Sequence, residues 1–500
     1  MSIFTENLES QFTMETSATP IPDDAPFRLL LTGDWSGKRA NLNRPIFIDR
    51  DNFEDVMRKL NVGVSLDLQG NDEDIIELKF QELDDFHPDN IFHQVPLFDD
   101  LRGTRQRLMN DNTFETAARE VRSWLVEDTP KVEKVESEPP PPSSGNLLDD
   151  ILSGGGTAAP TRTPQPTSSS ELNSLLSQLV APFLIKTDVN EQAKLVAAVD
   201  SASGELMRKI LHHPQFQALE AAWRGAYLVT SRVETDNKLK IYLLDLPKED
   251  LVADLKSAKD LRDSAFARLL TEKISGMKDD DFYAAVCANY VFKSNVDDIA
   301  TLMRIAEICK NADTPFIAQA DTQIIGLNSL MEFADTRNLG LSENSAEGKL
   351  WNMLREVDEA QYLGLTVPRL MARLPYGKFS DPTENFKFEE LSGENRHEQY
   401  CWMNSALACG MLLAQSFSHN EWEMGENLVT NIDGLPMYIY QNDSETFVKP
   451  GAEAVLTVSA ADQIMEQGLM LFVAYRDSDK IRLARFHSIR SDSKRLKGKW

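Results

Sequence analysis

The chain alternates short apolar segments, typical of strands, with longer segments in which apolar residues recur every three or four positions, typical of helices. The first apolar segment, Phe27 to Leu31, ends in a turn at residues 33–37. Ile46 to Ile48 predicts a second strand, and an amphipathic helix follows over residues 51–60. The pattern therefore predicts a small mixed α and β domain over residues 26–126.

A β-α-β unit is the clearest pattern in the C-terminal part of the chain. Residues 285–292 predict a strand, and residues 315–320 predict another. Between them, Ile299, Leu302 and Ala306 lie on one face of a predicted helix. Strands joined in this way are parallel, so a larger α/β domain with a β-α-β core is expected.

The segment between these two parts has a different composition. Residues 127–170 are rich in proline, glycine, serine and glutamate and contain few large apolar side chains. Such a segment cannot bury enough surface to offset the entropy of an ordered chain, so a disordered linker is predicted. The predicted organisation is a flexible lead-in over residues 1–25, a domain over 26–126, the linker over 127–170 and a domain over 171–500.

The charge of the chain bears on its partners and location. It carries 79 acidic and 52 basic residues, a net charge of −27, which argues against nucleic acid or an anionic membrane as the main partner. No apolar run reaches the ~18 residues of a membrane span, and the N-terminus lacks a signal pattern, so a cytoplasmic location is expected. The basic end of the chain, residues 494–500, is interpreted either as a solvated terminus or as an arm that binds an acidic neighbour.

No arrangement of residues predicts catalysis, a cofactor or a metal. There is no nucleophile elbow, no phosphate-binding loop and no closed set of metal ligands. His87 and His93 lie among acidic residues, but Pro88 lies between them and their spacing fits no closed metal site. They are therefore expected to be loop histidines and not metal ligands. His212, His213 and Glu220 are expected at surface or cap positions. An enzyme that uses the β-α-β core is kept only as an alternative.

Residues 359–390, called the signature segment below, contain the most specific pattern in the chain. Its sequence contains GLTVPRLMARLPYG, followed further on by FKFEE. It resembles the signature of the large subunit of the type VI secretion contractile sheath, and WNMLRE at 351–356 resembles the piece that precedes it. In the N-terminal part, RLLLTGDWSG, IDRDNFEDVM and LKFQELDDFHPDNI resemble the sheath small subunit.

The resemblance implies a structural assembly protein and not an enzyme. In this family a small and a large subunit form one unit, and units form hexameric rings around an inner tube and interlock by strand exchange. The implied partners are copies of the chain, the tube protein, baseplate components, other sheath subunits and an AAA+ unfoldase, which would recognise a helix near 146–152 or 171–179. Large subunits of the family continue beyond the point where this chain stops, so a non-contractile initiator, cap or baseplate collar is the alternative.

Six residues are candidates for structural or interface roles. Arg369 and Arg373 are expected to form buried or interfacial ion pairs with a carboxylate such as Glu389 or Glu390, and a contact with the next subunit is the alternative. Trp351 and Tyr376 are the other two candidates, because they belong to the same resemblance.

Overall fold

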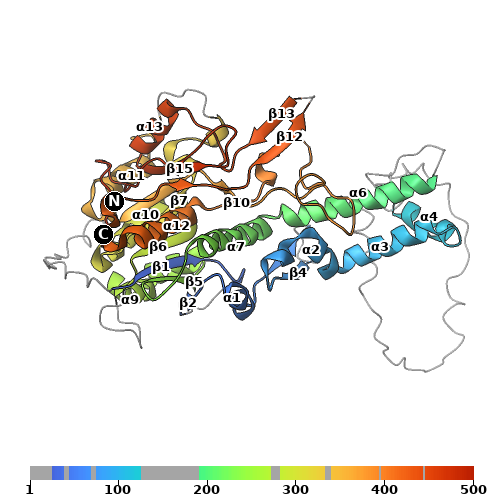
Figure 1. Ribbon diagram of the computed structural model, residues 1–500, viewed down its shortest axis with the longest axis horizontal. Coiled ribbons are helices and arrows are strands. Elements are labelled where there is room, and N and C mark those ends of the chain that lie inside the picture. The colour runs from blue at the N-terminus through green and yellow to red at the C-terminus, as the bar shows by residue number, and fades with distance from the viewer. Residues whose placement is uncertain are drawn as a thin grey trace, which may run out of the picture.

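The computed structural model describes residues 25–38, 44–68, 75–124, 191–271, 282–332, 339–393, 396–442 and 445–500. The predicted linker, residues 1–24 of the predicted lead-in and the two predicted helices at 146–152 and 171–179 lie outside these residues. The described part is elongated, with a body built on one large sheet and a helical arm that extends from it (Figure 1).

The body is organised around a nine-stranded mixed sheet within the described residues. From edge to edge its strands are β11 (Asn431–Ile432), β15 (Ile481–Leu483), β14 (Leu469–Ala474), β8 (Leu363–Val367), β7 (Phe316–Ala320), β6 (Ala285–Phe292), β1 (Phe27–Gly33), β5 (Leu239–Asp245) and β2 (Ile46–Phe47). The six strands from β14 to β5 are parallel, and β15, β11 and β2 are antiparallel to their neighbours. The predicted mixed α/β class is therefore confirmed.

Strand β1 comes from the N-terminal part of the chain but lies inside this sheet. Leu30 pairs with Tyr242 of β5 on one side and with Val286 of β6 on the other. All seven residues of β1 are buried, which explains its continuous apolar pattern, since parallel strands are covered on both faces. The N-terminal and C-terminal parts thus share one sheet, while the domain boundaries proposed from composition stay a prediction.

Helices cover both faces of the sheet. On one face α12 (Ser405–Asn420) packs against β1, β6, β7 and β8, and α7 (Pro214–Arg232) packs on α12. The other apolar cluster contains residues from α8 (Lys248–Ser257), α9 (Ala265–Thr271), α10 (Val296–Ala312), α11 (Ala346–Glu356) and α13 (Val458–Glu466). Helix α12 is apolar on nearly all sides because it lies between the sheet and α7.

The arm consists of α3 (Pro96–Met109), α4 (Phe114–Ser123) and α6 (Glu191–Leu211), as Figure 1 shows. Arg105 on α3 donates to Asp200 on α6 with a nitrogen–oxygen distance of 2.6 Å. Arg122 on α4 forms an ion pair with Glu191 at the start of α6. The described parts of the chain on either side of the segment 125–190 therefore lie near each other in the fold.

Three two-stranded sheets complete the described structure, together with α1 (Phe53–Leu60) and α2 (Pro88–Gln94). They are formed by β3 (Gly63–Asp67) with β4 (Ile75–Lys79), β9 (Leu370–Met371) with β10 (Trp402–Met403), and β12 (Tyr438–Asn442) with β13 (Glu445–Lys449). No helix in the described ranges has the length and apolar character that crossing a membrane requires.

The basic end of the chain packs on its own body, so neither of the two interpretations made from the sequence is right. Leu496 is buried, and the backbone N–H of Lys497 donates to the carbonyl of Gln361 at 2.9 Å. The Lys499 ammonium donates to the carbonyls of Ala312 and Asp313, both at 2.9 Å. A lysine in this position satisfies carbonyl groups left free at the C-terminus of α10.

Candidate functional site

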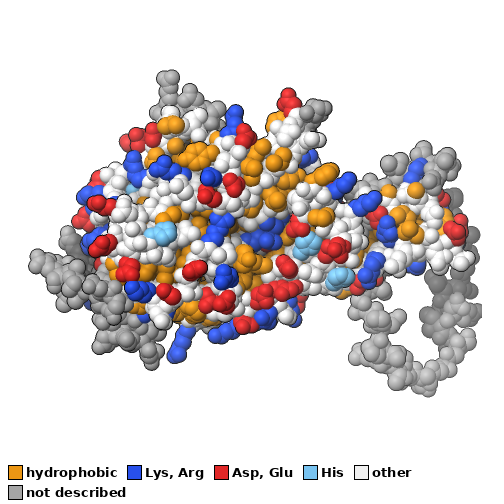
Figure 2. All heavy atoms as spheres, in the orientation of Figure 1, with side chains coloured by type: hydrophobic (Ala, Val, Ile, Leu, Met, Phe, Trp, Pro, Cys, Tyr) orange, Lys and Arg blue, Asp and Glu red, His pale blue; other side chains and the backbone are white. Residues whose placement is uncertain are grey.

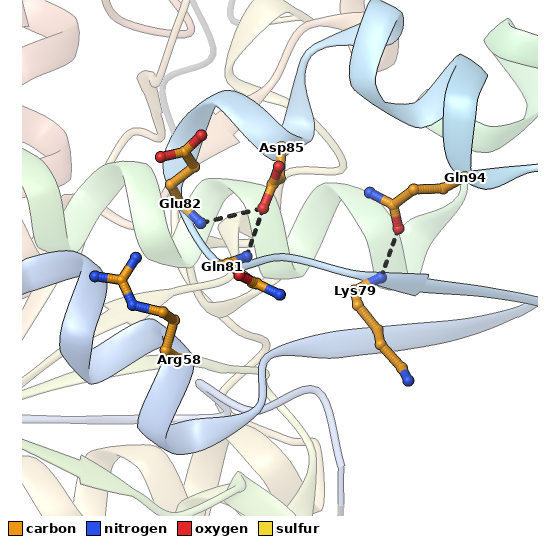
Figure 3. A pocket seen from close by; sticks show the side chains of 6 residues that line it. All are labelled: Arg58, Lys79, Gln81, Glu82, Asp85 and Gln94. Carbon is orange, nitrogen blue, oxygen red and sulfur yellow. Dashed lines mark hydrogen bonds between the residues drawn. The ribbon is translucent and has the colours of Figure 1, made fainter.

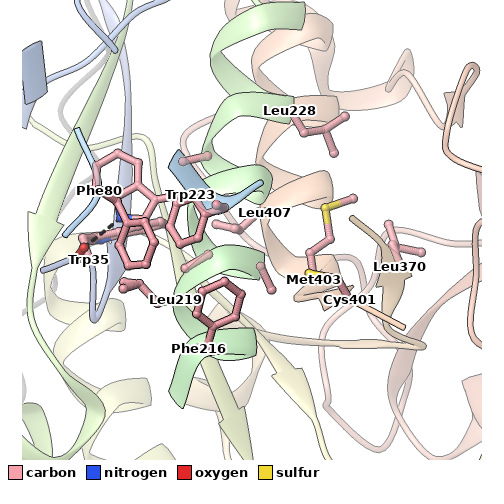
Figure 4. Packing of buried hydrophobic residues seen from close by; sticks show 14 of the residues in the cluster. Trp35, Phe80, Phe216, Leu219, Trp223, Leu228, Leu370, Cys401, Met403 and Leu407 are labelled. Atoms are coloured by element: carbon pink, nitrogen blue, oxygen red, sulfur yellow. Dashed lines mark hydrogen bonds between the residues drawn. The ribbon is translucent and has the colours of Figure 1, made fainter. Parts of the chain in front are cut away.

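The surface where residues 25–124 meet residues 191–500, called the junction below, contains most of the motifs noted in the sequence. The turn after β1 is its first element. The backbone N–H groups of Trp35 and Ser36 donate to the buried carboxylate of Asp245, at 2.8 and 3.1 Å. The indole N–H of Trp223 on α7 donates to the carbonyl of Trp35 at 2.8 Å, with the two rings edge to face. Figure 4 shows Trp35 held beside Trp223 in this way.

Asp34 in the same turn carries a charge that the fold disfavours. Burial raises the pKa of Asp34 to about 6, and the nearby carboxylates of Asp245, Glu249 and Asp250 act in the same direction. A hydrogen bond from the backbone N–H of Gly37 only partly offsets these effects. Because the pKa is higher in the folded chain than in the unfolded chain, the charged carboxylate opposes folding above about pH 6.

Replacing this carboxylate tests that electrostatic cost. We expect Asp34→Asn to raise the free energy of unfolding at pH 8 by up to about 1 kcal/mol, a value reduced for the solvent exposure of the side chain. The gain should shrink as the pH falls from 6 towards 4, where Asp34 is already protonated in the folded chain. Urea denaturation at pH 4, 6 and 8 measures it, and an equal effect at all three pH values would contradict this origin.

The second element of the junction joins α2 to the signature segment. Asp89 accepts hydrogen bonds from the backbone N–H groups of Glu384 and Asn385, at 2.8 and 3.0 Å. The ring of Phe92 stacks on Phe386 with a centroid distance of 5.1 Å. His87 packs edge to face on Tyr376. The acidic and histidine residues of this motif thus bind other parts of the same chain.

A buried charge network forms the third element. Arg373 of the signature segment donates two hydrogen bonds to Glu220 on α7, at 2.6 and 3.0 Å. It donates two more to Glu390, at 2.7 and 2.9 Å. Arg224, one turn along α7, also donates to Glu220, at 2.8 Å. Two bidentate pairs on one guanidinium hold three separate segments of chain in one geometry.

Tyr376 extends this network to the N-terminal part. Its backbone N–H donates to Glu390 at 2.7 Å, and its hydroxyl accepts from Arg224 at 3.0 Å and lies 3.5 Å from the carbonyl of Phe86. Burial alone would raise the pKa of Glu220, but Arg373 and Arg224 outweigh it and lower that pKa to about 2. Glu220 is therefore charged at neutral pH, whereas burial raises the pKa of Glu390 although Arg373 pairs with it.

The structure places the other candidate residues elsewhere. Arg369 forms ion pairs as expected, but its partners are Glu398 and Glu453 and not Glu389 or Glu390. Glu389 is exposed and accepts from the backbone N–H of Lys378 at 3.1 Å. Trp351 is buried in the core on the opposite face of the sheet, and its indole N–H has no hydrogen-bond partner among the described residues.

Arg369 belongs to a second charged cluster, at the base of the hairpin formed by β12 and β13. Its guanidinium donates to Glu453 at 2.7 Å and to both carboxylate oxygens of Glu398 at 3.0 Å. His397 lies 3.2 Å from Glu453 and 3.3 Å from the Lys449 ammonium. Burial lowers the pKa of Lys449 to about 8.

The spacing of His397, Glu398 and Glu453 would fit a metal ion, because one ligand atom from each lies within 4.8 Å of the others. The guanidinium of Arg369 already donates to both carboxylates, however. Their charge is compensated by this arginine, so the cluster is better described as an ion-pair network that anchors β13.

The hairpin of β12 and β13 has two open edges. Each of its strands contains five residues, and among the described strands each pairs only with the other. Ile439 and Phe447 are 56% and 39% exposed, and Tyr440 stacks on Phe447 across the strands. Hydrophobic side chains are visible over the hairpin in Figure 2. Open edges with apolar side chains favour the addition of further strands.

Other strand edges in the described structure are better protected. The end strands of the large sheet, β2 and β11, contain only two residues each, and Pro45 precedes β2. At the end of β4, the backbone N–H of Lys79 donates to the Gln94 side chain at 2.9 Å, and that of Gln81 donates to Asp85 at 2.6 Å (Figure 3). Short or capped edges resist strand addition, so the β12–β13 hairpin is the clearest docking site for another strand.

Sequence reasoning missed Glu220, which it assigned to the surface or to a cap. The side chain is completely buried, between Arg373 and Arg224. The available signal was a single glutamate on a helix that is otherwise apolar around it, with an arginine four residues later. The hairpin of β12 and β13 was also missed, although residues 438–449 include Tyr, Ile, Thr, Phe and Val, which favour strands.

Comparison with known proteins gives matches for both parts of the chain. Residues 193–491, more than half of the chain, match the VipB family, described as EvpB/VC_A0108, tail sheath N-terminal domain. Residues 8–139 match a family described as type VI secretion system, VipA, VC_A0107 or Hcp2. The type VI secretion system sheath protein TssC1 of Pseudomonas aeruginosa strain PAO1 is 30% identical over 303 residues, which cover 59% of this chain and 61% of that protein.

Proposed function

The chain belongs to the type VI secretion sheath family, with a VipA region and a VipB region in one polypeptide, and we propose on this premise that it assembles with copies of itself into a cytoplasmic sheath around an inner tube. The family is a structural family and not an enzyme family. The matched part spans 61% of the length of TssC1, so the function of the whole TssC1 protein is a proposal for this chain.

The observation that carries the proposal is the pair of open edges on the β12–β13 hairpin. In strand exchange, an extended segment of one subunit completes the sheet of its neighbour through backbone hydrogen bonds. The hairpin supplies two such edges, and the Arg369 cluster and the packing of Tyr438 on Tyr400 hold its base on the body. An isolated two-stranded hairpin is only marginally stable, so added strands would stabilise it.

A charged residue on this hairpin should weaken assembly without unfolding the subunit. We expect Ile439→Lys to raise the concentration needed for assembly at least tenfold, about 1.4 kcal/mol, because the exposed side chain would be buried by an added strand. Ile75→Lys is the matched control, since Ile75 is 51% exposed on β4 and Ile439 is 56% exposed on β12. Sedimentation velocity measures both variants, and equal loss of assembly in the two would contradict a specific role of the hairpin.

The proposed partners follow from the family. They are further copies of the chain, in rings of six or a helical polymer, the inner tube protein, baseplate components, other sheath subunits and an AAA+ unfoldase. Arg369, Arg373, Glu389, Glu390, Trp351 and Tyr376 are proposed to act mainly within the subunit. We propose neither a nucleic-acid partner nor insertion into a membrane.

Negative-stain electron microscopy of the purified chain, alone and with the tube protein of the same system, tests the proposal. Tubes or stacked rings that form when tube protein is added would support a sheath. Arrest at single rings would favour an initiator, cap or collar that does not contract. A monomer that ignores the tube protein would refute the assembly function.

A further inference from the structure

Phe379 is the most exposed large hydrophobic side chain among the described residues, with 91% of its surface accessible. It lies at the tip of a turn, residues 377–381, in the signature segment. The Lys378 ammonium lies over its ring, 5.2 Å from the ring centre. An aromatic side chain that remains fully in water contributes nothing to the stability of its own fold.

The turn that presents Phe379 is firmly held. The backbone N–H of Gly377 donates to the carbonyl of Asp381 at 2.9 Å, and that of Ser380 donates to the carbonyl of Gly377 at 3.1 Å. The Ser380 hydroxyl donates to the carbonyl of Pro375. The ring is therefore displayed on a preorganised loop, which lowers the entropy lost when a partner binds. Exposed aromatic residues in such positions are typical of binding anchors.

A hollow that fits such an anchor lies beside β11 and β15. Its apolar lining consists of Leu428, Ala484 and Phe486, and its volume is about 400 Å³, enough for a phenyl ring. Arg485 and Arg495 line the same hollow, and within the described residues neither guanidinium has a hydrogen bond or an ion pair.

We propose that Phe379 of one copy inserts into this hollow of a second copy. Three exposed carboxylates follow Phe379 in the chain, namely Asp381, Glu384 and Glu389, and their charge is complementary to that of Arg485 and Arg495 in the hollow. Lys378 beside the ring can meet Glu426, which also lines the hollow.

A contact between two different surfaces of identical chains is heterologous, so its repetition generates a closed ring or a helical polymer. A sheath assembled from copies of the chain requires symmetry of this type. The inference rests on the proposed function because it assumes that copies of the chain associate. It is also compatible with strand exchange, because the β12–β13 hairpin is a separate surface.

Disulfide trapping between two full-length chains tests the contact directly. One chain carries Phe379→Cys and the other Ser493→Cys, a nearly isosteric change in the lining of the hollow. The four native cysteines, Cys287, Cys309, Cys401 and Cys409, are buried and contribute little background. The control replaces Phe379→Cys by Val458→Cys, because Val458 is 80% exposed on α13.

We expect the Phe379→Cys and Ser493→Cys pair to give at least a tenfold higher yield of the mixed disulfide dimer than the Val458→Cys control. An equal yield in both pairs overturns the inference. The result is separable from the proposed function: trapping without tubes would refute the sheath and keep the contact. Tubes without selective trapping would keep the sheath and refute the contact.

Discussion

A chain that begins at residue 158 is expected to lose its cooperative fold. Without the N-terminal part, β5 and β6 face a gap where β1 normally pairs with both of them. The seven buried residues of β1 and the Trp35 turn would be missing from the core, and their loss should exceed the total stability of about 5–15 kcal/mol. Near-ultraviolet circular dichroism and size-exclusion chromatography measure the loss.

Co-expression of residues 1–157 with residues 158–500 is the matched control. We expect the two pieces to purify as a 1:1 complex with the spectrum of the intact chain. The reason is that Arg122 and Glu191, which lie close to the two ends of the segment 125–190, form an ion pair, so the points that this segment joins are close together in the fold. A soluble, cooperatively unfolding 158–500 fragment would contradict the shared sheet.

Replacing Arg373 by Ala is expected to lower the free energy of unfolding by about 3–5 kcal/mol. The substitution leaves Glu220 and Glu390 buried, both nearly without solvent contact, and only Arg224 remains to compensate Glu220. Urea denaturation at pH 7 measures the change. The pKa of Glu220 is lowered to about 2, so its stabilising effect is present above about pH 4.5 and is lost as the pH falls towards 2.

Arg262→Ala provides the comparison for Arg373→Ala. Arg262 forms its ion pair with Asp260 on the surface, where such pairs contribute little to stability. A further variant, Arg373→Met with Glu390→Gln, should lose less stability than Arg373→Ala, because position 390 is then neutral and Glu220 keeps its ion pair with Arg224. A loss below about 1 kcal/mol in Arg373→Ala would show that the network does not hold the junction.

The elements of the fold were largely predictable, but the position of β1 in the sheet was not. The predicted strands at 285–292 and 315–320 correspond to β6 and β7, and the apolar run at residues 27–31 lies within β1. Apolar runs reveal buried strands because the pattern is local. The insertion of β1 between β5 and β6 depends on pairing between residues far apart in the chain, which no local pattern encodes.

The partners of the candidate residues were also predictable only in part. Arg373 does contact Glu390, but its second partner, Glu220, is on α7 and was expected at the surface. Arg369 pairs with Glu398 and Glu453, not with the glutamates nearest in the signature segment. Local sequence identifies which charges need a partner, and tertiary packing decides which partner they find.

Cryo-electron microscopy of tubes assembled from the chain and the tube protein tests the role of the β12–β13 hairpin most directly. The reconstruction should show an added strand from a neighbouring copy on each open edge, so that the two-stranded sheet of the free chain becomes four-stranded. Tubes in which the hairpin remains two-stranded would contradict assembly by strand exchange at this site.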